Sequence, residues 1–229
     1  MKLSVLSSIL FTGSILALCT AESFSAGAEA GDWKSLFDGK TTAGWRGYGK
    51  TKFPEEGWAV KDGCLVKVEG ERGGNIVTEA EFNDFELEWE WKLPPKSNNG
   101  VKYLVTESRP SAPGHEYQMI DDSTVRDPRS KTATFYDVLP LSVKSPIKPP
   151  GEWNTSRIVV RGNHVEHWLN GTKVLAYELG SAEVKAAVAK TKFKDEPGFG
   201  EKTKGRIMLT DHGDEAWFRK IRIRELPAK

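Results

Sequence analysis

The stretch Asn98–Asp122 reads NNGVKYLVTESRPSAPGHEYQMIDD, and its pattern decides the fold that the rest of the chain follows. Two runs have the composition of β-strands, Val101–Thr106 and Glu116–Ile120. The loop between them holds two prolines and a glycine, which favour a turn of the chain. The stretch therefore predicts two neighbouring strands of an antiparallel sheet.

Side chains alternate between the two faces of a strand, so the sequence also predicts which residues share a face. Glu116 and Gln118 lie on one face, opposite Tyr117 and Met119. The first strand divides into Val101, Tyr103 and Val105 on one face and Lys102, Leu104 and Thr106 on the other. A carboxylate, an amide and a lysine would then form the floor of a polar groove wide enough for one sugar. The alternative is a half-solvated sheet face with ordinary charges.

The remaining patterns indicate an all-β chain. Phe82–Leu93 alternates, which places Phe85, Leu87, Trp89 and Trp91 on a buried face and Glu86, Glu88 and Glu90 on a water-facing edge without a catalytic role. Trp58–Val68 predicts a hairpin around Asp62-Gly63. The one convincing helix is 181–194, with Ser181 as its N-cap. About a dozen short strands and one helix predict a single β-sandwich over residues 31–229.

Residues 1–30 have the features of a secretory signal peptide. Lys2 precedes the apolar run Leu3–Leu18, and small-x-small cleavage sites follow at 26–30. Cys19 allows a bacterial lipoprotein as an alternative, although Leu18 stands where a small residue is expected. With no second apolar run, the mature chain is expected to be secreted or periplasmic, soluble or held by a lipid at Cys19.

Composition argues against several classes of protein. Removing residues 1–30 leaves 32 basic and 30 acidic residues, with no long run of one sign, so neither nucleic acid nor a membrane surface is an expected partner. Cys64 is the one cysteine left, which rules out an intrachain disulfide and gives no zinc-binding spacing.

Seven short motifs occur together and in order, and as a set they resemble the 3-keto-disaccharide hydrolase family over residues 32–226. The motifs are Leu36–Gly39 with Trp45, Asn98–Val101, Glu116–Gln118 with Asp121, Lys148–Asn154, His167–Gly171, Asp211–Gly213 and Phe218–Leu226. Lys220 departs from the Asn usual in the last motif. The resemblance implies a concanavalin A-like jelly-roll sandwich with one peripheral helix, and action on glycosides oxidised at C3 of the sugar.

Such a substrate needs a base near C2, an electrophile near the C3 oxygen and an acid near the leaving oxygen, because the ketone acidifies the C2 hydrogen and allows β-elimination across C1–C2. Rehydration of the product would give net hydrolysis. The candidate catalytic residues are Glu116, His167 and His212. The candidate substrate-binding residues are Lys102, Gln118, Asp121, Arg157 and Asp211.

Each candidate also has a structural explanation. His167 shares its face with Val165 and Leu169 and could simply pack on the core, Asp211-His212 could form a turn, Asp121 could initiate one, and Arg157 could decorate a strand. His115 and His164 are expected to be exposed. No cofactor is certain, but Glu116, His167 and Asp211 could together hold a divalent cation that polarises the ketone. The alternative functions are a carbohydrate-binding module without catalysis and a protein-interaction domain.

Overall fold

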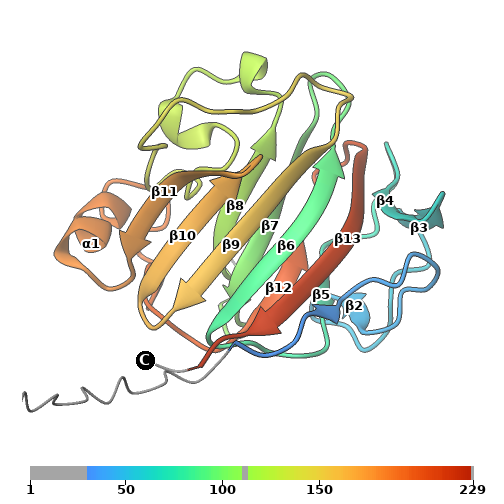
Figure 1. Cartoon of the computed structure of the whole chain (residues 1–229), viewed down its shortest axis with the longest axis horizontal. Helices are drawn as coiled ribbons and strands as arrows, with labels where there is room; N and C mark the ends of the chain where they lie inside the picture. The colour runs from blue at the N-terminus through green and yellow to red at the C-terminus, as the bar shows by residue number, and fades with distance from the viewer. Residues whose placement is uncertain (1–29, 110–112, 228–229) are drawn as a thin grey trace, which may run out of the picture.

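The computed structural model describes residues 30–109 and 113–227, and within these residues thirteen strands form two antiparallel sheets. The larger sheet has the order β11-β10-β9-β6-β13-β4-β3, with β1 also paired to β13, and the smaller has the order β2-β5-β12-β7-β8. Figure 1 shows β6, β9, β10 and β13 in front, with β7, β8 and β12 behind them. This architecture confirms the predicted all-β sandwich of two sheets. The predicted signal peptide, including Cys19, lies almost entirely outside the described residues.

The bounds of the elements are as follows. The larger sheet contains β1 (Lys34–Ser35), β3 (Trp58–Lys61), β4 (Cys64–Lys67), β6 (Phe85–Lys92), β9 (Asn154–Arg161), β10 (His164–Leu169), β11 (Thr172–Glu178) and β13 (Ala216–Glu225). The smaller contains β2 (Trp45–Gly47), β5 (Ile76–Thr78), β7 (Asn98–Val105), β8 (His115–Ile120) and β12 (Arg206–Leu209). The helical elements are α1 (Ala182–Val188) and two short 3₁₀ turns, Asp122–Thr124 and Pro128–Ser130.

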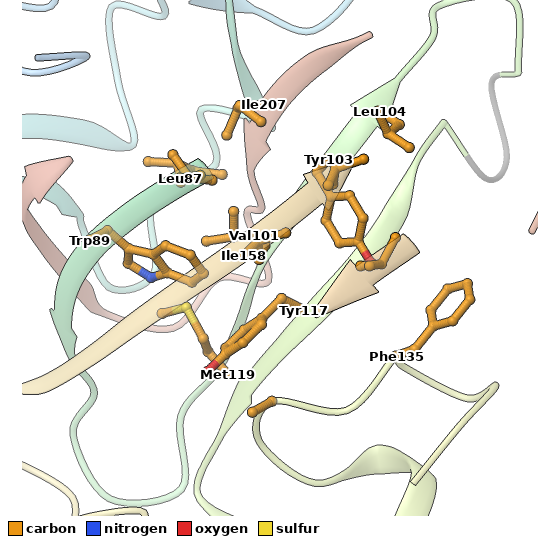
Figure 2. Packing of buried hydrophobic residues seen from close by; sticks show 14 of the residues in the cluster. Leu87, Trp89, Val101, Tyr103, Leu104, Tyr117, Met119, Phe135, Ile158 and Ile207 are labelled. Carbon is orange, nitrogen blue, oxygen red and sulfur yellow. The ribbon is translucent and has the colours of Figure 1, made fainter. Parts of the chain in front are cut away.

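The core lies between the two sheets and follows the predicted alternation of β6. Phe85, Leu87, Trp89 and Trp91 are all buried. Trp89 packs edge-on against Tyr117 of the opposite sheet, with ring centroids 5.0 Å apart, and Figure 2 shows the two rings near Met119 and Ile158. The hairpin is also confirmed, because β3 and β4 are joined by Asp62 and Gly63 with the positive φ values that a tight turn requires.

The Trp89→Ala variant should lower the free energy of unfolding by roughly 3–5 kcal/mol, because it leaves a large cavity that the two sheets cannot close. Denaturant unfolding of the variant and the wild-type protein measures this difference. A loss below about 1 kcal/mol would mean that the indole does not contribute to the packing between the sheets.

The acidic face of β6 points outward as predicted, but it does not lie at an edge of the sheet. β6 is central, between β9 and β13. Glu86, Glu88 and Glu90 pair with arginines of β13 that lie directly across from them, Arg224, Arg222 and Arg219. The glutamates therefore form a ladder of ion pairs on the outer surface of the larger sheet.

The predicted helix at 181–194 is too long. α1 spans Ala182–Val188 and is the only α-helix among the described residues. Ser181 caps it as expected, by accepting from the Val184 amide. Val184 and Val188 are its buried residues, one turn apart, and the Thr191 hydroxyl then donates to the Val188 carbonyl where another helical turn would begin. Over residues 30–109 and 113–227, no helix is long and apolar enough to cross a membrane.

The predicted alternation of β7 fails at its end. Leu104 has a φ of 52° and belongs to the core, whereas Val105 packs in a separate cluster with Val77 and Met208. The register with β12 shows the cause: the three residues from Arg206 to Met208 face the four residues from Val105 to Lys102. One extra residue in β7 forms a β-bulge, which exchanges the faces of the residues after Tyr103.

Candidate active site

Glu116 and Gln118 lie on the outer face of the smaller sheet, as their alternation predicts. β8 pairs with β7 so that Lys102 is directly across from Glu116 and Gly100 is across from Gln118. Tyr117 and Met119 point the other way, into the core. The side chains of Lys102, Glu116 and Gln118 form the floor of a cavity of about 130 Å³, which we call the groove. Its lining residues are Asn98, Lys102, Glu116, Gln118, Tyr136, Lys192, Phe193 and His212.

The Glu116 carboxylate is the centre of charge in the groove. Its Oε2 is 3.4 Å from the Lys102 ammonium and its Oε1 is 4.0 Å from His212 Nε2. Burial alone would raise the pKa of the Glu116 carboxyl, but His212 and the charge of Lys102 outweigh it, so the pKa lies below its ordinary value. Glu116 is therefore ionised at neutral pH, which a general base requires.

Three wall residues of the groove, Tyr136, Lys192 and Phe193, were not among the sequence candidates. The Lys192 ammonium is 3.3 Å from the Tyr136 hydroxyl and 4.6 Å from the centre of that ring. Both segments are irregular connections, where hydrophobic periodicity gives no information on direction. The wall adds a second cation and a phenol to the groove.

Asn98 was also missed, although its motif was recognised. Its backbone amide donates to Asp214, but its buried side-chain Oδ1 has no hydrogen-bond partner within the described residues. A buried acceptor without a donor is costly, unless a ligand supplies the donor. A sugar hydroxyl in the groove could do so.

His212 reaches the groove from a loop that Asp211 holds in place. Asp211 pairs with the fully buried Lys67 at 3.1 Å and accepts from the backbone amides of Gly74 and Gly213. The Lys67 ammonium also donates to the carbonyls of Val68 and Glu71. Asp211 does not line the groove, so the structure places it as a support of the His212 loop rather than as a contact for substrate.

The structure does not bring His167 and Arg157 to the groove. His167, on β10 of the larger sheet, points into the core, where its Nδ1–H donates to the Ala133 carbonyl and its Nε2 accepts from Tyr103. The face it shares with Val165 and Leu169 is the buried one, so its structural explanation is correct. Arg157 lies on the outer surface of the larger sheet, paired with Glu86 and stacked on Trp168.

Asp121 and the other two histidines also differ from the functional expectation. Asp121 begins a 3₁₀ turn and accepts from the amides of Lys96 and Ser123. His115 is fully buried rather than exposed, because it shares the inward face of β8 with Tyr117. His164 is half-buried and pairs with Glu178.

The proposed metal ligands Glu116, His167 and Asp211 are not assembled, because the first faces the groove, the second the core, and the third is held by Lys67. Among the described residues no group of three or more His, Cys, Asp or Glu side chains comes together as a metal site. The donors nearest a cation in the groove would be Glu116 and His212. The Lys102 ammonium already supplies a positive charge beside that carboxylate.

A larger cavity, of about 250 Å³, lies at the ends of β6 and β8 and is partly formed by the motif Lys148–Asn154. Its lining is mainly apolar, with Trp91, Leu93 and Ile147. Asp121, on its rim, already accepts backbone hydrogen bonds. We assign the chemistry to the smaller groove, because an ionised carboxylate, two lysines, an imidazole and an unpartnered acceptor converge there.

The comparisons with known proteins show the family to which the chain belongs. Residues 32–224 match the family model described as a 3-keto-alpha-glucoside-1,2-lyase-like domain, and the chain belongs to this family. It is 33% identical over 242 residues to a 3-keto-disaccharide hydrolase of Bacteroides thetaiotaomicron, covering 90% of this chain and 82% of that protein.

Two solved structures from Parabacteroides distasonis, each named a "putative glycosyl hydrolase", are also similar. The first has a TM-score of 0.76 at 32% identity, over 85% of this chain and 94% of that one. The second has a TM-score of 0.69 at 30% identity, over 85% of this chain and all of that one. The expected family and its class of glycoside-cleaving enzymes are therefore confirmed.

Proposed function

We propose that this protein cleaves 3-keto-glycosides by β-elimination across C1–C2, and that Glu116 is the base. The observation that carries the proposal is the ionised Glu116 carboxylate held between Lys102 and His212 on the floor of the groove. The family membership of the chain supplies the substrate class.

The chemistry follows from the ketone. Glu116 takes the proton from C2, and the electron pair of the C2–H bond forms an enolate whose charge rests on the C3 oxygen. The enolate then collapses, a C1–C2 double bond forms, and the bond from C1 to the leaving oxygen breaks as that oxygen takes a proton. Addition of water across the double bond completes a net hydrolysis.

Each remaining group of the groove has a role that its charge suits. Lys102, beside the base, stabilises the negative charge that develops on the C3 oxygen. His212, beside the carboxylate, gives a proton to the leaving oxygen. Tyr136 with Lys192 forms a second donor pair on the wall of the groove, and the Asn98 Oδ1 and the Gln118 amide bind sugar hydroxyls.

The predicted signal peptide at residues 1–30 supports a secreted or periplasmic location for this reaction. A protein exported by such a leader would meet oxidised glycosides outside the cytoplasm. Fractionation of the source cells, with and without residues 1–30, would test the location: retention in the cytoplasm with the leader present would contradict it.

Incubation of the pure protein with a chromogenic 3-keto-glucoside and with its parent glucoside tests the activity. We expect release of the chromophore from the keto compound alone, because the parent lacks the acidic C2 hydrogen. Release from both substrates would contradict elimination. Release from neither, together with retention on a polysaccharide column, would favour the carbohydrate-binding module.

A further inference from the structure

Gly100 lies under the Glu116 side chain, in the middle of β7. It is paired with Gln118 on the neighbouring strand β8, and Glu116 lies two residues before Gln118 on the same face, as its diagonal neighbour. Its φ is not in the positive range that only glycine adopts easily, so the backbone at this position would accept other residues. The reason for a glycine must therefore be the space that a side chain would occupy.

The side chain of Glu116 fills that space. A Cβ atom added to Gly100 would overlap Oε1 of Glu116 and lie 3.0 Å from its Cδ and 3.1 Å from its Cγ. The three nearest atoms all belong to this one side chain. Gly114 and Gly205, by contrast, would place a Cβ against the backbone of β7, where no side-chain rotation gives relief.

The effect of a side chain at position 100 depends on which atoms move to remove the overlap. The end of the Glu116 side chain is flexible, so a Cβ at position 100 would push the carboxylate away from the sheet rather than unfold it. Oε2 would leave Lys102, now 3.4 Å away, and Oε1 would leave the vicinity of His212. A shift of about 1 Å at a catalytic group is enough to lower a rate substantially.

We infer that Gly100 is a positioning residue: its missing side chain lets the Glu116 carboxylate lie flat on the sheet between Lys102 and His212. The inference rests on the proposed function for its effect on catalysis, but the geometry can be tested separately. It also gives a physical reason for the glycine in the motif Asn98–Val101.

A cycle of variants measured by thermal unfolding tests the geometry without any assay of activity. Gly100→Ala should lower Tm by about 2–4 °C in the wild-type protein. In a Glu116→Ala background the overlap is gone, and the same change should leave Tm unchanged or raise it slightly, because alanine loses less backbone entropy than glycine on folding. An equal loss of Tm in both backgrounds would overturn the inference.

A crystal structure of the Gly100→Ala variant is a second test of the geometry. The carboxylate of Glu116 should move away from Lys102 while β7 and β8 keep their register. An unmoved carboxylate, with the strands displaced instead, would contradict the positioning role.

Kinetics on the chromogenic 3-keto-glucoside then connects the geometry to catalysis. Gly100→Ala should lower kcat by about 10–100-fold with KM little changed, since the groove keeps its shape and only the base is misplaced. Gly31→Ala is the control: Gly31 contacts Glu225 at the end of β13 in the larger sheet, and its variant should keep full activity.

Full kcat in Gly100→Ala would overturn the positioning role even if the wild-type protein is active. An inactive wild-type protein would instead overturn the proposed function, and the unfolding cycle and the crystal structure would still decide the inference.

Discussion

Glu116→Gln is expected to lower kcat on a 3-keto-glucoside by about 10²–10⁴-fold, the usual contribution of a positioned base. The amide keeps the size of the side chain and most of its contacts but cannot accept the C2 proton. The ionised state of Glu116 and its placement beside Lys102 and His212 are the reasons for choosing this carboxylate.

The matched control is Glu88→Gln. Glu88 is also a sheet glutamate paired with a cation, Arg222, but it lies on the outer surface of the larger sheet. This variant should keep full activity. Full activity in Glu116→Gln, with a folded protein, would remove Glu116 as the base.

Acidification from pH 7 to pH 4.5 is expected to lower the free energy of unfolding by about 5 kcal/mol through two buried histidines. Burial, with a smaller contribution from nearby charges that include Arg109, lowers the pKa of His115 to about 3. Burial also lowers the pKa of His167 to about 4, although its hydrogen bond to Ala133 acts in the opposite direction. Both imidazoles are therefore neutral in the folded protein at pH 4.5.

The sign follows from the unfolded chain, where both histidines have a pKa near 6.5. Above that pH neither state binds the protons, and stability is at its full value. As the pH falls below 6.5 the unfolded chain binds two protons that the folded protein does not bind. Each histidine therefore lowers the free energy of unfolding by about 1.4 kcal/mol per pH unit. The loss continues until the pH passes the lowered pKa values.

Denaturant unfolding at a series of pH values measures this slope. His167→Gln should reduce it by about half, because the amide can still accept from Tyr103 and donate to Ala133 but does not titrate. An unaltered slope in His167→Gln would contradict the assignment.

Much of the fold was predictable because it depends on local patterns. The alternation of β6 identified the buried Trp89 and Trp91, and Asp62-Gly63 identified the β3–β4 turn. The bulge at Leu104 was not predictable, since one extra residue in a strand leaves no mark in a run of apolar and polar side chains. The early end of α1 depends on Thr191, whose hydroxyl competes for a helix carbonyl.

The floor of the groove was predictable for the same reason, and its walls were not. Glu116, Gln118 and Lys102 follow from alternation and the pairing of β7 with β8. Alternation gives the face of a residue within its strand but not the sheet to which the strand belongs, so Arg157 was placed in the wrong layer. Lys67 and Asp211 come together only through the tertiary fold.

The fate of the C2 hydrogen tests most directly the central claim, that cleavage begins with removal of this hydrogen. The measurement is NMR of the sugar product formed from an unlabelled 3-keto-glucoside in D₂O by the wild-type protein. Elimination predicts that no product keeps the original hydrogen at C2: an unsaturated product has none there, and a rehydrated product carries deuterium. A product that retains the C2 hydrogen would mean that the glycosidic bond breaks by direct hydrolysis, and would contradict the account.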